Sequence, residues 1–171
     1  MITIKINQEE VDESKRLTKV FDSVKTYEKF VCKTNYIGIL GEMVFNRYLN
    51  EQHIEHYWHK FIKQGWNKPD FNINDKTIDL KTTYSDLMWF QQPKFDIYIY
   101  AQITSDDKYL HVKGWMTKQG LERAQKNNKA NIVKRGSRID YVIPPNKMLP
   151  ISLLSVVFPP PQQLYNHEVL K

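Results

Sequence analysis

The chain has 171 residues, of which 41% are apolar and 26% are charged, and its formal net charge is +6. This length suffices for one domain with a sizeable core, and the positive charge suits an anionic partner such as a nucleic acid. The single cysteine excludes an intramolecular disulfide, no apolar run is long enough to cross a membrane, and the N-terminus lacks a signal-peptide pattern. We therefore expect a cytoplasmic protein that is not bound to a membrane, with one domain over residues 1–171.

The first predicted element is a long polar helix over residues 8–33. Its apolar residues, which include Val11, Leu17 and Val20, recur at close to 3.6 positions. This apolar stripe packs either on the core of the same chain or on a second copy. The second alternative would make the protein a homodimer.

A second predicted helix follows, with Asn35 as its cap, and it carries Glu42 among apolar residues. An ionised carboxylate in such surroundings is costly unless it is paired or binds a metal. Two interpretations remain open: Glu42 pairs with Arg47 or a lysine at the helix edge, or it belongs to a metal site. Gly38 and Gly41 weaken the helix, which indicates that another segment packs closely against this turn.

Residues 53–61 are predicted to form a strand, and residues 69–81 a hairpin. Asn74 and Asp75 supply the turn, because these residue types tolerate the backbone angles that a tight hairpin requires. The hairpin is the most informative part of the chain, since it carries two acids and a lysine.

Asp70 lies on the first strand of this hairpin, and Asp79 and Lys81 lie on the second. Side chains alternate along a strand, so Asp79 and Lys81 point to one face while Ile78 and Leu80 point to the other. Two carboxylates can hold a hard divalent cation through oxygen. A cation and a lysine together can activate water against a phosphodiester.

The tripeptide Asp/Glu-x-Lys occurs three times, so the pattern alone is not informative. The copies that begin at Glu13 and Asp106 lie in a charged helix and in a polar turn. The copy that begins at Asp79 has an apolar centre, an apolar flank and a second acid one hairpin away. We therefore assign the chemistry to this copy.

The remaining predicted elements are an irregular segment at 83–94, strands at 95–104 and 109–116, a short helix capped by Thr117 that extends to Gln125, a basic loop at 126–138, and a Pro-rich segment at 144–171. Lys134, Arg135 and Arg138 lie in the basic loop. They either contact the phosphates of a nucleic acid or keep a solvated loop soluble. Together these elements predict an α+β fold with a central mixed β-sheet flanked by helices.

In sequence order, the chain has Gly41-Glu42 on a helix, Pro69-Asp70 opening a hairpin, and Asp79-Leu80-Lys81 closing it. This order resembles the PD-(D/E)xK nuclease superfamily, which has the restriction-endonuclease-like fold, over roughly residues 36–118. The resemblance implies an α/β/α-type core in which Glu42, Asp70 and Asp79 bind Mg²⁺ and Lys81 helps orient the attacking water.

The resulting hypothesis is a metal-dependent deoxyribonuclease, with an endonuclease favoured and with Mn²⁺ as a substitute for Mg²⁺. The carbonyl of Leu80 would add one more oxygen ligand to the metal. Two alternatives stay open: an inactive nucleic-acid-binding or assembly module on the same fold, and an RNA-processing nuclease.

Overall fold

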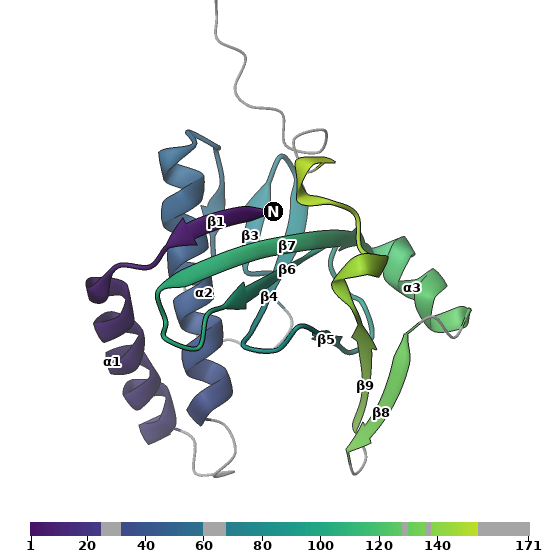
Figure 1. The fold of residues 1–171 in the computed structure, drawn as a ribbon, viewed down its shortest axis with the longest axis horizontal. Coiled ribbons are helices and arrows are strands. Elements are labelled where there is room, and N and C mark those ends of the chain that lie inside the picture. The colour runs from purple at the N-terminus through teal and green to yellow at the C-terminus, as the bar shows by residue number, and fades with distance from the viewer. Residues whose placement is uncertain (25–31, 60–67, 128–129, 136–137, 154–171) are drawn as a thin grey trace, which may run out of the picture.

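A six-stranded mixed sheet lies at the centre of the molecule (Figure 1). The computed structural model describes residues 1–24, 32–59, 68–127, 130–135 and 138–153. Helices α1 and α2 pack on one face of the sheet, and α3 and a smaller three-stranded sheet cover the other. The predicted α+β fold, with helices on both faces of a mixed sheet, is confirmed.

The strands of the large sheet follow the order β1 (Ile2–Lys5), β7 (Tyr109–Thr117), β6 (Ile97–Ile103), β4 (Lys76–Thr83), β3 (Phe71–Ile73) and β2 (Tyr57–Trp58). Within the described residues, β4 and β6 are the one parallel pair of this sheet. The small sheet is antiparallel, with the order β5 (Met88–Phe90), β9 (Arg138–Ile143) and β8 (Asn131–Arg135). The helices are α1 (Gln8–Val24), α2 (Cys32–Glu51) and α3 (Lys118–Lys126), with 3-10 turns η1 (Pro145–Lys147) and η2 (Ile151–Leu153).

The predicted N-terminal helix is confirmed over Gln8–Val24, and residues 25–31 lie outside the described residues. Cys32 and Lys33, expected at the end of this helix, belong to α2 instead. The cap predicted at Asn35 is wrong, because α2 begins before that residue. Ser14 and Thr18 face the interior, and their hydroxyls donate to the carbonyls of Val11 and Ser14. Such back-bonding satisfies buried hydroxyl groups.

The predicted hairpin is confirmed by its backbone angles. Asn74 and Asp75 have φ angles of 46° and 59°, which are the positive values that a two-residue hairpin turn of type I′ requires. Upstream of it, the strand expected over 53–61 is limited to Tyr57–Trp58 among the described residues. His53 there has a φ of 55°, which is incompatible with an extended strand.

In the second half of the chain, the predicted strands correspond to β6 and β7. The predicted helix corresponds to α3, where the Thr117 hydroxyl accepts a hydrogen bond of 3.0 Å from the Gly120 amide. The irregular segment at 83–94 instead contains β5, and the basic loop at 126–138 is wrong. This region contains the end of α3 and the β8–β9 hairpin. Both corrections concern the small sheet, whose strands pair across about fifty residues of sequence.

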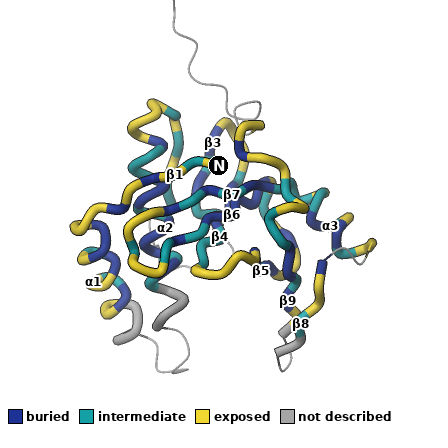
Figure 2. Tube along the Cα trace, viewed as in Figure 1, coloured by how far each residue is buried: buried dark blue, intermediate teal, exposed yellow. Residues whose placement is uncertain are grey.

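Two apolar clusters fill the two sides of the large sheet, and Figure 2 shows the buried residues concentrated in the central strands. One cluster joins α1 and α2 to the sheet. The other joins the sheet to α3, β5 and β9. No helix among the described residues is long and apolar enough to span a membrane.

Helix α2 approaches β4 very closely at Gly41. A Cβ atom at Gly41 would lie 2.1 Å from Oγ1 of Thr82, whereas a Cβ at Gly38 would meet nothing within 4 Å. The expectation of a close contact is therefore confirmed for Gly41 and wrong for Gly38. The absence of a side chain at Gly41 sets the distance between the helix and the strand.

We expect Gly41→Ala to destabilise the fold by roughly 1–3 kcal/mol, because the new methyl group overlaps Thr82. Gly38→Ala is the matched control. It should be neutral or stabilise the fold by about 0.5–1 kcal/mol, since alanine favours the helix. Urea unfolding of the two variants tests the difference, and equal free energies of unfolding would contradict the close-contact assignment.

Candidate active site

Strand β4 presents different chemistry on its two faces. Ile78 and Leu80 belong to the apolar cluster that includes α2. Asp79 pairs in register with Tyr98 of β6, whose side chain belongs to the opposite cluster. Paired residues in a sheet project to the same side. Asp79 and Lys81 therefore point away from the α2 core, as the alternation of the sequence predicts.

Asp79 and Lys81 form an ion pair, with 2.6 Å between Oδ2 and Nζ. The Asp79 side chain is 10% exposed and that of Lys81 is 36% exposed. Although the atoms are close, Asp79 Oδ2 has no hydrogen-bond partner of good geometry among the described residues. Burial by itself would lower the pKa of Lys81, but the charges of Asp79 and Asp70 outweigh it and the pKa is raised. Lys81 is therefore protonated at neutral pH.

Asp70 lies just before β3, where its backbone amide donates to the Ile78 carbonyl at 2.8 Å. Its Oδ2 accepts a hydrogen bond of 2.6 Å from the Leu80 amide. The N–H and the C=O of a strand residue point toward the same neighbouring strand. The Leu80 carbonyl therefore points toward Asp70, as the Leu80 amide does. Burial, followed by the charges of Glu42 and Asp79, raises the pKa of Asp70 well above its usual range.

Glu42 reaches this region from α2, next to Gly41. Its Oε2 accepts a hydrogen bond of 3.2 Å from Nε1 of Trp58. The pKa of Glu42 is raised to about 7, mainly by burial and also by the charge of Asp79, while the Trp58 N–H and the charge of Lys81 oppose the shift. The sequence alone does not reveal the contact with Trp58, because an indole in an apolar segment gives no sign of its partner.

Arg47, one of the partners considered for Glu42, is engaged elsewhere. Its Nε lies 2.8 Å from Glu10 of α1, and its Nη1 lies 2.6 Å from Glu51. The ion pair with Glu10 fastens α1 to α2. Of the two interpretations of Glu42, the pairing with Arg47 is therefore wrong.

Glu42, Asp70 and Lys81 are thus close enough to Asp79 for its charge to contribute to the raised pKa of each of the three. Among the described residues, no group of three or more Asp, Glu, His or Cys side chains is placed so that the group could hold a metal ion. Mg²⁺ does not require such a group, because it is usually held by one or two carboxylates together with waters and substrate phosphates. The oxygen donors, the raised carboxylate pKa values and the unsatisfied Asp79 oxygen fit a hard divalent cation.

The three basic residues predicted to contact nucleic acid lie on the small sheet. Lys134 and Arg135 belong to β8, and Arg138 belongs to β9, where it pairs with Arg135. Their side chains lie outside the described residues. Their backbones form a hairpin, so the predicted flexible loop is replaced by a regular element.

Comparisons with known proteins give one structural similarity. No protein family matches the sequence, and no curated protein matches it either. A solved structure of D212, a nuclease from a fusselovirus, is similar to this chain with a TM-score of 0.41 and 12% sequence identity. The similarity covers 77% of this chain and 94% of that one. The proposed activity rests on the geometry of the site.

The raised pKa of Glu42 should make the metal-free protein less stable as pH rises. The carboxyl has a pKa of about 7 in the folded protein and an ordinary value of 4.5. Between these values the folded state binds more protons than the unfolded state, so the free energy of unfolding falls with rising pH. The full effect is on the order of 3 kcal/mol.

Glu42→Gln should make the stability profile less steep between pH 4.5 and 7, leaving the slope that the raised pKa of Asp70 contributes in the same direction. The measurement is urea unfolding in a chelator across this pH range. Glu55→Gln, at an exposed glutamate, is the control. A profile of Glu42→Gln identical to that of the wild type would show that Glu42 titrates normally.

Proposed function

We propose that this chain is a metal-dependent nuclease of the PD-(D/E)xK type that hydrolyses DNA phosphodiester bonds, most simply as an endonuclease. One observation carries the proposal: the ion pair between Lys81 and the buried carboxylate of Asp79 lies beside two further carboxylates whose pKa values are raised. Holding three partly or fully buried acids around one lysine is costly for a structural site. A divalent cation would offset this cost, and it would serve phosphodiester hydrolysis at the same place.

In this proposal, Asp70 and Asp79 hold Mg²⁺ or Mn²⁺, and Glu42 and the Leu80 carbonyl complete the oxygen ligands. When bound, the cation supplies Lewis-acid stabilisation of the charge that develops on the scissile phosphate. Asp70 keeps one oxygen on the Leu80 amide, which fixes the direction of its carboxylate. Asp79, which is paired with Lys81 in this structure, would supply a carboxylate oxygen to the cation.

Lys81 is then free of its ion pair and can act on substrate. Its raised pKa means that it carries a proton, so it orients the attacking water and stabilises negative charge by donating hydrogen bonds. The water oxygen forms the new bond to phosphorus as the bond to the leaving oxygen breaks. The proton lost by the attacking water goes to solvent, and the leaving oxygen takes up a proton from solvent.

We expect cleavage of DNA by the wild type in Mg²⁺ or Mn²⁺, and DNA binding without cleavage in Ca²⁺. Asp79→Asn should lower the cleavage rate at least about a hundredfold, because it removes a charged ligand and the partner of Lys81. The matched control is Asp106→Asn, which changes the exposed Asp-x-Lys copy on the β6–β7 turn and should cleave normally. The assay uses single-stranded, duplex and branched DNA, with RNA in parallel.

Full activity of Asp79→Asn, or of the wild type in a chelator, would contradict the metal mechanism. A wild type that binds DNA but never cleaves it would instead identify a nucleic-acid-binding module. Faster cleavage of RNA than of DNA would identify an RNA-processing enzyme on the same fold.

The basic β8–β9 hairpin is proposed to contact the phosphate backbone. Replacing Lys134, Arg135 and Arg138 together by alanine should reduce the slope of log affinity against log salt by roughly 2–3 units, since each phosphate contact releases about one counterion. The measurement is DNA affinity in Ca²⁺ across a salt series. The control variant replaces Lys15, Arg16 and Lys19 by alanine. These are exposed basic residues of α1, which packs on the opposite face of the sheet. Equal slopes for the two triple variants would refute a specific role for the hairpin.

A further inference from the structure

The positive charge of this protein is concentrated in one segment. Residues 113–147 contain nine Lys or Arg residues but only two Asp or Glu residues. The rest of the chain contains sixteen Lys or Arg residues and seventeen Asp or Glu residues. The net charge of +6 therefore arises from the end of β7, α3, the β8–β9 hairpin and η1. This segment forms a single region at one end of the molecule (Figure 1). Such a region attracts a polyanion.

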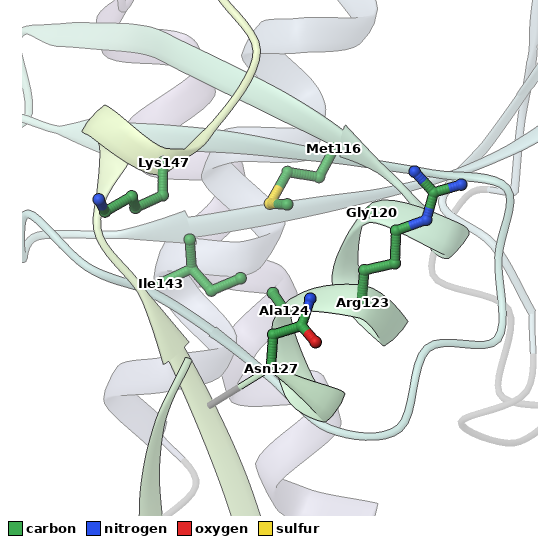
Figure 3. A pocket seen from close by; sticks show the side chains of 7 residues that line it. All are labelled: Met116, Gly120, Arg123, Ala124, Asn127, Ile143 and Lys147. Atoms are coloured by element: carbon green, nitrogen blue, oxygen red, sulfur yellow. The ribbon is translucent and has the colours of Figure 1, made fainter. Parts of the chain in front are cut away.

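A cavity of about 260 Å³ lies within this region, between α3, the end of β7 and the β9–η1 segment. The apolar part of its wall comes from Met116, Ala124 and Ile143, whose side chains surround the same space in Figure 3. Gly120 adds no side chain to the wall and leaves the space open. Small-molecule sites usually measure about 300–1,000 Å³, so this cavity suits a single planar ring system and excludes larger ligands.

Two cationic residues flank the cavity. Arg123 of α3 and Lys147 of η1 line opposite sides of it with their aliphatic stems, and their charged ends point outward and apart (Figure 3). Neither forms an ion pair with a carboxylate of the described residues. Asn127 adds a side-chain amide at the rim, which can both donate and accept hydrogen bonds.

We propose that this cavity binds one unpaired nucleobase of a single nucleic-acid strand. A nucleotide within a strand has a phosphate on each side, which matches one cation on each side of the opening. The base enters the apolar space, where the polarisable sulfur of Met116 contacts its ring and the Asn127 amide reaches its polar edge. A paired base is inaccessible to such a pocket, so the protein selects strands with unpaired nucleotides.

The cavity and the candidate active site lie on the same face of the large sheet. Ala124 and Ile143 belong to the apolar cluster that contains Tyr98, and Tyr98 is paired in register with Asp79. A strand anchored in the cavity therefore approaches the face that carries the Asp79–Lys81 pair. The inference rests on the proposed nuclease function for its substrate class, but base binding can be measured without cleavage.

The test compares the affinity of the full chain in Ca²⁺ for a single-stranded oligonucleotide and for the same sequence in a duplex. The wild type should prefer the single strand. Replacing Arg123 and Lys147 together by alanine should lower this preference roughly tenfold, the scale of one bound base. The control double variant removes Lys118 and Lys126, two basic residues of α3 that do not line the cavity. This control variant should lose affinity for the single strand and for the duplex equally, so that the ratio of the two affinities is unchanged.

Gly120→Leu tests the pocket without changing charge. A Cβ at Gly120 would lie 3.3 Å from Oγ1 of Thr117 and 3.4 Å from Cε of Met116, so small shifts of these two side chains are needed to admit it. Because the helix also gains from losing a glycine, we expect the variant to fold. A thermal unfolding curve checks this. The leucine fills the cavity and should abolish the preference for single strands while duplex affinity stays unchanged. A single strand of abasic nucleotides keeps the phosphates but has no bases. The affinity of the wild type for this strand should be as low as the affinity of Gly120→Leu for the normal strand.

No preference of the wild type for single strands, or an unchanged ratio in both cavity variants, would overturn the inference. If these outcomes occur while Mg²⁺-dependent cleavage persists, the nuclease proposal still stands. If the cavity variants behave as expected but no metal supports cleavage, the nuclease proposal fails and the base-binding pocket remains.

Discussion

The close approach of α2 to β4 at Gly41 is the constraint on which the candidate site depends. Because Gly41 has no side chain, the helix can lie against Thr82. The next residue, Glu42, is thereby brought within electrostatic range of Asp79. A helix held farther away by one methyl group would weaken the interaction between Glu42 and Asp79. The close packing at Gly41 therefore strengthens the contribution of the helix to the candidate site.

The buried charges of the site are balanced incompletely by the protein itself. Lys81 offsets one carboxylate, and the N–H groups of Trp58 and Leu80 each stabilise another. The raised pKa values of Glu42 and Asp70 show that these partners do not fully compensate burial and mutual repulsion. Strained electrostatics of this kind are concentrated at functional sites. A bound cation would convert the same repulsion into coordination energy.

The two faces of the large sheet differ in chemistry. The face toward α1 and α2 is closed by an apolar cluster and by the ion pair between Glu10 and Arg47. The other face carries Asp79 and Lys81 and is extended by the basic region around α3 and the small sheet. An acidic centre next to a basic surface suits a polyanionic substrate. Under the proposed function, the basic surface would attract the polymer, and the acids would hold a cation that screens its phosphates.

The sequence by itself determined the features that depend on near neighbours. The hairpin follows from the turn residues Asn74 and Asp75, and the common face of Asp79 and Lys81 follows from strand alternation. The tertiary structure decided which distant residues meet. It paired Arg47 with Glu10 of α1 instead of with Glu42, and it paired β9 with β5, a segment that the sequence left irregular. Local patterns depend on backbone geometry over a few residues, whereas partners across fifty residues are selected by packing, which no short pattern encodes.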